Sequence, residues 1–186
     1  MDFKIMTFAI EAHASVNQEY DGRPYFVHLC LVYNQAIRFI ELIPQHRRND
    51  VLNAVWLHDT IEDCRLTYND ILKISNKEVA ELVYAVTNEK GKNRQERAND
   101  KYYKGIRETE FATFIKLCDR LANVIYSRET NSRMFDVYKK ENQDFLKHLF
   151  ERPDQQLRYR ELVQGLKDAL DITPTTVNTY TPDWDD

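Results

Sequence analysis

The chain has 186 residues, of which 42% are hydrophobic and 30% are charged, a balance that is ordinary for one globular domain with a single core. A formal net charge of −4 gives no support to nucleic-acid or anionic-membrane binding, and no apolar run approaches membrane-spanning length or resembles a signal peptide. Three cysteines without metal-ligand spacing favour free thiols in a reducing compartment, so we expect a cytoplasmic protein.

Glycine and proline are scarce, with four and five copies, and the long segments between them predict an all-α fold of about eight to ten helices. We expect a turn at residues 19–24. The expected helices cover about residues 2–17, 25–42, a third from Asn49 or Asp50, a short fourth and a fifth capped by Thr67 and Asn76 and ending near Asn88, then 93–108, 112–128, 134–150 and 153–170. Residues 1–170 then form the domain, and residues 171–186, rich in Thr, Pro and Asp, are expected to be a flexible, disordered tail.

The most informative segment lies at the end of the expected third helix, where a histidine and three carboxylates follow an apolar run. Glu62 comes four residues after His58, and Asp63 comes four after Asp59. One helix would therefore carry all four side chains on one broad side. Unpaired charges are costly beside a buried segment, so a bound metal ion is one partner to expect.

Two other helices carry residues of the same kind. His28 lies on the expected second helix, and Asp119 is a lone acid on the buried helix over about 112–128, with Asn123 one turn later. Divalent ions commonly take histidines and carboxylates from several helices. Spacing alone is a weak signal for a metal site, and His13, His46 and His148 are interpreted as surface or packing residues.

Four ordered motifs extend this hypothesis. After Ala12-His13 they read GRPYFVH at residues 22–28, AVWLHDTIED at 54–63, VAELVYAVT at 79–87 and IKLCDRLAN at 115–123. They resemble the H…HD…D signature of the HD-domain phosphohydrolase superfamily. Within it they are most similar to the hydrolase domain of RelA/SpoT-type enzymes and to the stand-alone small alarmone hydrolases, over about residues 5 to 150.

The resemblance implies an HD-domain helical bundle that hydrolyses a phosphate ester. His28, His58, Asp59 and Asp119 would hold one divalent ion, expected to be Mn²⁺. Glu62 and Asp63 would position and deprotonate the attacking water, and Asn123 would orient the substrate or a metal-bound water. Superfamily members with two metals need further histidines between the HD pair and the last Asp, and this chain has none between positions 59 and 119.

Other residues are candidates for substrate binding, each with a structural alternative. Arg94, Arg97 and Lys101 would form one stripe of the basic helix, either binding phosphate or simply facing solvent. The remaining candidates are Arg23, Tyr138, which is equally well a core aromatic, and Tyr20, which could stack on a base. Where alarmone hydrolases usually carry an Arg-Lys pair that grips guanine, this chain reads Gln18-Glu19-Tyr20-Asp21.

The leading hypothesis is a metal-dependent pyrophosphohydrolase of a small nucleotide, with a guanosine 3′-diphosphate alarmone (ppGpp) as the first candidate. The alternatives are an HD-fold module that binds or senses a nucleotide without turnover, and a 5′-nucleotidase-like enzyme. We expect neither nucleic acid nor a membrane as a partner. The sequence leaves open the exact base, the physiological metal, regulation and the oligomeric state, a homo-oligomer included.

Overall fold

The computed structural model describes residues 2–151 and 153–171, and within them the fold is all-α, as the sequence predicts. All nine expected helices are present, and four of them are interrupted, including the one expected over 25–42, which ends at Arg38 and is followed by a 3-10 turn. The described elements are α1 (Phe3–Ser15), β1 (Glu19–Tyr20), β2 (Arg23–Pro24), α2 (Phe26–Arg38), η1 (Ile40–Leu42), η2 (Gln45–Arg47), α3 (Arg48–Leu57), α4 (Thr60–Asp63), α5 (Tyr68–Ile74), α6 (Lys77–Val86), α7 (Arg94–Arg97), α8 (Asp100–Glu108), α9 (Ala112–Glu129), α10 (Met134–Leu149), α11 (Pro153–Arg158) and α12 (Arg160–Ala169). No described helix is both long and apolar enough to cross a lipid bilayer.

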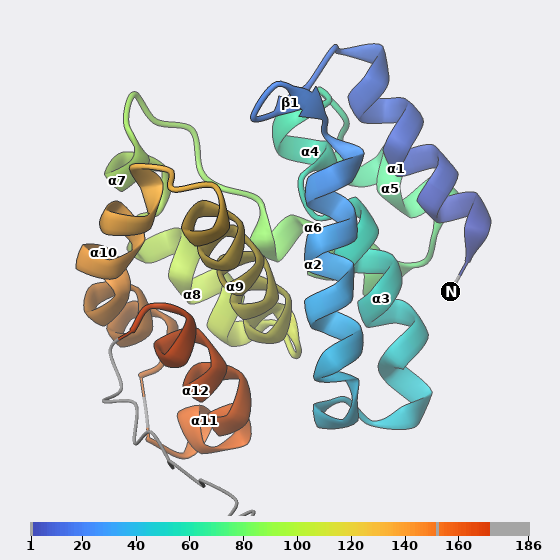
Figure 1. Cartoon of the computed structure of the whole chain (residues 1–186). Helices are drawn as coiled ribbons and strands as arrows, with labels where there is room; N and C mark the ends of the chain where they lie inside the picture. Colours follow the sequence, from blue (N-terminus) through green and yellow to red (C-terminus); the bar gives the residue numbers. More distant parts are fainter. Residues whose placement is uncertain (1, 152, 172–186) are drawn as a thin grey trace, which may run out of the picture.

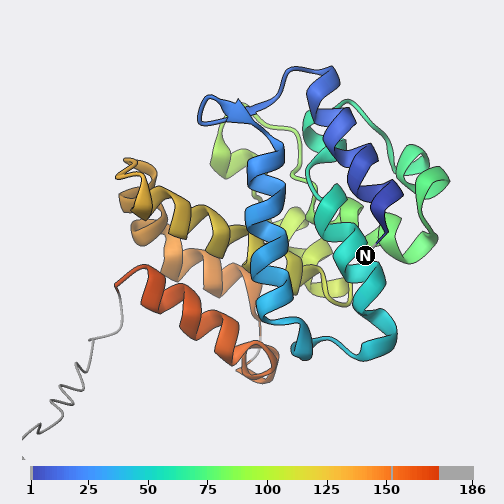
Figure 2. The same cartoon turned by 45° about the vertical axis from the view of Figure 1, so that its right-hand side comes forward.

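Helix α2 runs through the middle of the molecule and joins two groups of helices (Figures 1 and 2). One group holds α1 and α3 to α6, and the other holds α7 to α12. α2 packs against α3 on one side and α9 on the other. Leu29, Val32 and Ala36 on α2 are fully buried, as are Leu117 and Cys118 on α9. The apolar faces of α2 and α9 therefore place His28 and Asp119 opposite each other.

The expected third helix is interrupted at the informative segment. α3 ends at Leu57 and the one-turn helix α4 begins at Thr60. The His58 ring donates from Nδ1 to the carbonyl oxygen of Val55 at 2.8 Å, and the Thr60 hydroxyl donates to Leu57 O at 2.6 Å. Because these side chains take carbonyls that a continuous helix would use, the backbone turns at Asp59. The prediction of one continuous helix through residue 63 is wrong, and so are the caps at Asn49 or Asp50, since α3 starts at Arg48.

The prediction of one continuous basic helix over 93–108 is also wrong, because the segment forms two helices. Asn93 caps α7, and Asn99 caps a separate helix α8 by accepting a hydrogen bond from Tyr102 N. The helix over 153–170 is likewise divided at Tyr159. Thr67 and Asn76 cap α5 and α6 as predicted. The expected turn is a short antiparallel hairpin, β1–β2, and the predicted tail at 171–186 lies outside the described residues except for Asp171.

Candidate active site

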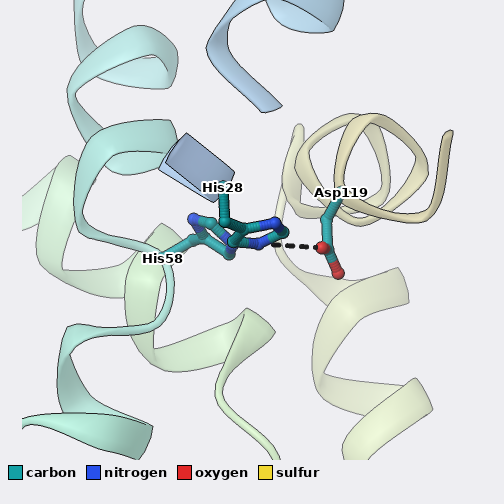
Figure 3. Close-up of side chains that lie close together, drawn as sticks. All are labelled: His28, His58 and Asp119. Atoms are coloured by element: carbon teal, nitrogen blue, oxygen red, sulfur yellow. Dashed lines mark hydrogen bonds and ion pairs between the residues drawn. The ribbon is translucent and has the colours of Figure 1, made fainter. Parts of the chain in front are cut away.

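The described residues bring together a buried group that is able to hold a metal ion. One donor atom each from His28, His58 and Asp119 lies within 4.8 Å of the others. Figure 3 shows the three side chains arriving from separate elements and converging on one point. The two Nε2 atoms are 3.3 Å apart, and His28 Nε2 lies 3.4 Å from Asp119 Oδ1. This part of the predicted ligand set is therefore assembled by the fold.

Asp59, the fourth predicted ligand, borders the same point. Its Oδ2 lies 3.0 Å from His58 Nε2 and 3.4 Å from His28 Nε2. Because His58 donates from Nδ1 to a backbone carbonyl, its Nε2 is the ring nitrogen left with a lone pair for an ion. Two imidazole nitrogens and two carboxylates are a donor set suited to a divalent transition metal. The residues present fit such an ion.

The charges of the centre stabilise one another. Burial lowers the pKa of His28, but its hydrogen bonds to Asp119 and Asp59 outweigh burial and raise it to about 9. Burial likewise opposes the charge on Asp119, yet Lys116 and His28 hold the pKa of that carboxyl below its usual range. Despite burial, His58 and His28 likewise hold the pKa of Asp59 below its usual range, so both carboxylates are ionised at neutral pH, which is the form that binds a cation.

Asp119 is surrounded on α9 by residues one turn away. Lys116 Nζ lies 2.8 Å from Asp119 Oδ2, and the Asn123 side chain donates from Nδ2 to Asp119 Oδ1 at 2.6 Å. The hydroxyl of Tyr20 in the hairpin donates to Asn123 Oδ1 at 3.0 Å. Asn123 is thus oriented from both sides, and the hairpin is tied to α9.

The two carboxylates predicted to act on water lie on α4, on the pocket side of the centre. Glu62 Oε1 accepts a hydrogen bond from Asn88 Nδ2 at 3.0 Å and lies 3.9 Å from Arg97 Nη1. Asp63 Oδ2 accepts one from Gln18 Nε2 at 3.3 Å. Burial, together with the nearby Asp59 and Glu62 carboxylates, raises the pKa of Asp63 to about 6. Such a carboxylate is a stronger base than an exposed aspartate and is still ionised at neutral pH.

These groups open into a pocket of about 840 Å³, large enough for a nucleotide. The predicted residues that line it are Tyr20, His28, Asp59, Glu62, Asp63, Arg94, Arg97, Asp119, Asn123 and Tyr138. Of the other three, His58 is buried behind the pocket lining, and Lys101 and Arg23 lie elsewhere. Lys101 pairs with Glu89 at 2.7 Å, because the break before α8 turns it away from Arg94 and Arg97. The Arg23 guanidinium lies 5.9 Å over the Tyr126 ring.

The lining residues that the sequence did not indicate include Tyr25, Lys116 and Arg120, which contact predicted site residues. Tyr25 donates to Asp59, Lys116 pairs with Asp119, and Arg120 packs 4.8 Å over the ring of Tyr138. Lys116 was the easiest to infer from the sequence, because it precedes Asp119 by three residues and so lies on the same side of the helix. Arg120 gives no such signal, because its partners Tyr138 and Glu141 come from another helix, α10.

No model of a known protein family matches the chain. A guanosine-3′,5′-bis(diphosphate) 3′-pyrophosphohydrolase of Aquifex aeolicus is 35% identical over 120 residues, which are 63% of this chain and 16% of that protein. The enzyme of the same activity called MESH1 in Danio rerio is 28% identical over 120 residues, or 64% of each chain. MESH1 of Drosophila melanogaster is 35% identical over 74 residues, 40% of this chain and 41% of that one. The chain is homologous to these pyrophosphohydrolases. It spans less than two thirds of the length of each.

A solved structure agrees on the fold. The structure of a metazoan orthologue of SpoT that hydrolyses ppGpp superposes with a TM-score of 0.62 and covers 88% of this chain and 96% of its own. Its sequence is 22% identical to this chain. The HD-type helical bundle that the four motifs imply is therefore confirmed.

Proposed function

We propose that the chain is a metal-dependent hydrolase that removes pyrophosphate from the 3′ position of guanosine 3′,5′-bis(diphosphate). The observation that carries the proposal is the meeting of His28, His58 and Asp119 beside the carboxylates of Glu62 and Asp63, at one pocket of a chain homologous to such hydrolases. Hydrolysis needs both groups, because metal ligands without a base would only bind the nucleotide.

The ion we propose is a single Mn²⁺ held by His28, His58, Asp59 and Asp119. When bound, such an ion lowers the pKa of a water ligand and offsets charge on a phosphoryl group. The mixed nitrogen and oxygen donors suit Mn²⁺, as they suit neighbouring transition metals.

All three cysteines are free thiols, which supports a reducing, cytoplasmic location.

The two carboxylates of α4 have different roles towards the attacking water. Asp63 takes the proton of the attacking water, a role supported by its raised pKa. Asn88 holds both carboxylate oxygens of Glu62 by hydrogen bonds, and the remaining lone pairs of Glu62 orient that water. Asn123, fixed by Asp119 and Tyr20, offers its side chain to the substrate from the opposite wall.

The pocket has two ends of different character, one lined by cations and the other by an aromatic ring of the hairpin. Arg94, Arg97, Lys116 and Arg120 come from α7 and α9 and suit the phosphate groups, while Tyr138 lies beneath the guanidinium groups of Arg94 and Arg120. On the hairpin side the pocket is lined by Tyr20, whose ring suits stacking on a base. Acidic and neutral residues at 18–21 replace the Arg-Lys pair of alarmone hydrolases, so we propose that the base is recognised less strictly.

The test is a panel of nucleotides incubated with Mn²⁺ and analysed for released phosphate and pyrophosphate. We expect pyrophosphate from guanosine 3′,5′-bis(diphosphate), and loss of that activity in Asp59→Ala and Glu62→Ala. Unchanged turnover in both variants contradicts the mechanism. A nucleotide that stays bound and intact with the metal indicates a binding module, and release of orthophosphate from monophosphates indicates a 5′-nucleotidase-like enzyme.

A further inference from the structure

Asp59 has a neighbour that the proposed mechanism does not use. The hydroxyl of Tyr25 donates a hydrogen bond to Asp59 Oδ2 at 2.5 Å. The same oxygen lies 3.0 Å from His58 Nε2 and 3.4 Å from His28 Nε2. The phenol therefore holds the carboxylate oxygen that faces both histidines. A carboxylate fixed in this way needs less ordering when it binds an ion.

The position of Tyr25 follows from the start of α2. Tyr25 is the residue before the helix, and its carbonyl oxygen accepts a hydrogen bond from His28 N at 2.9 Å. Residues three apart at a helix start project to the same side. The first turn of α2 thus supplies one metal-site histidine and also the hydrogen-bond partner of a ligand on another element.

The ring of Tyr25 is in turn packed by His13 from α1. The two rings stack with their centroids 4.3 Å apart and their planes at 22°. His13 is 1% exposed, and neither of its ring nitrogens has a hydrogen-bond partner among the described residues. Its described contact with Tyr25 is made through the ring face. Tyr20 meets the same phenol edge-on, with centroids 6.3 Å apart.

We infer that Tyr25 and His13 are positioning residues for the metal centre. His13 fixes the Tyr25 ring by stacking, and Tyr25 fixes Asp59 by its hydrogen bond, so that a residue of α1 governs how tightly the ion is held. The inference rests on the proposed metal site. Partners of metal ligands typically change affinity or activity by about 10–100-fold when they are removed.

The first test removes the hydroxyl and leaves the ring. We expect Tyr25→Phe to raise the dissociation constant for Mn²⁺ by about 10–100-fold, measured by calorimetric titration of the full chain after chelation. The matched control is Tyr33→Phe, which removes a hydroxyl from the same helix at a ring 5.0 Å from Trp56. Melting curves in chelator show whether each variant is folded. We expect a higher Mn²⁺ concentration to restore hydrolysis in Tyr25→Phe, a rescue that a merely structural defect would not show.

The second test separates the ring of His13 from its polarity. His13→Phe keeps an aromatic face against Tyr25 and is expected to bind Mn²⁺ within about threefold of the wild-type constant, whereas His13→Ala weakens binding about tenfold or more. Equal binding by wild type and Tyr25→Phe overturns the inference and leaves the proposed function intact. A His13→Phe variant as weak as His13→Ala contradicts the stacking role. Absence of Mn²⁺ binding by the wild type overturns the metal site itself.

Discussion

Replacing Lys116 by methionine tests whether the pair with Asp119 stabilises the core of the site. The two charged atoms are 2.8 Å apart, and the side chains are 18% and 11% exposed. At an effective dielectric constant near 20, their attraction is about 6 kcal/mol, and loss of hydration on burial offsets part of it. Breaking a buried pair by removing one partner typically costs about 3–5 kcal/mol. Because both groups keep some contact with solvent, we expect the lower end, about 3 kcal/mol, or roughly 6–12 °C in Tm.

The assay is thermal and urea unfolding of Lys116→Met in the presence of a chelator. Its control is Lys104→Met, where the partner Glu108 is 3.7 Å away and both side chains are about two thirds exposed, so the loss should stay below about 0.5 kcal/mol. With Mn²⁺ added, the deficit of Lys116→Met should shrink, since the ion supplies positive charge beside Asp119. Equal stability of the two variants in chelator would refute the reasoning.

Three further predictions concern the metal, the base and the loop before α7. Mn²⁺ at a hundredfold excess over its dissociation constant should stabilise the wild type by about 2.7 kcal/mol and His58→Ala not at all, as measured by thermal shift with and without chelator; an equal gain in both disproves the ligand assignment. Asp63→Asn should lower kcat by about 10²–10⁴-fold while Mn²⁺ still binds, and kcat within twofold of wild type would contradict its role as the base. Gly91→Ala should raise KM more than it lowers kcat, because its Cβ would lie 2.7 Å from Glu96 Cβ and displace α7; Gly105→Ala, with nothing within 4 Å, is the control, and an equal KM in both argues against the loop's role.

Local structure was accessible from the sequence where it depends on neighbours along the chain. Thr67 and Asn76 cap their helices as predicted, since a capping side chain bonds backbone groups two or three residues away. The break at Asp59 was not predicted, although the side chains of His58 and Thr60 that cause it are local. Helical spacing describes a regular backbone and gives no warning that side chains will take up the carbonyls. Assuming a regular helix also led to the incorrect prediction that Lys101 shares one stripe with Arg94, although a break before α8 separates them.

The residue types of the site and their order could be read along the chain: a histidine on one expected helix, the His58–Asp59 pair on a second and Asp119 on a third. Their spacing was a weak signal for a metal site, and the resemblance of the four motifs to HD-domain hydrolases made a metal hydrolase the leading hypothesis before any packing was known. The packing of α2 between α3 and α9, which brings His28 within 3.4 Å of Asp119, became visible in the folded structure alone. The same holds for the hydrogen bond from Tyr25 to Asp59 and for the stacking of His13 on the Tyr25 ring. Contacts between distant helices depend on how buried faces pack together, which no spacing within one helix specifies.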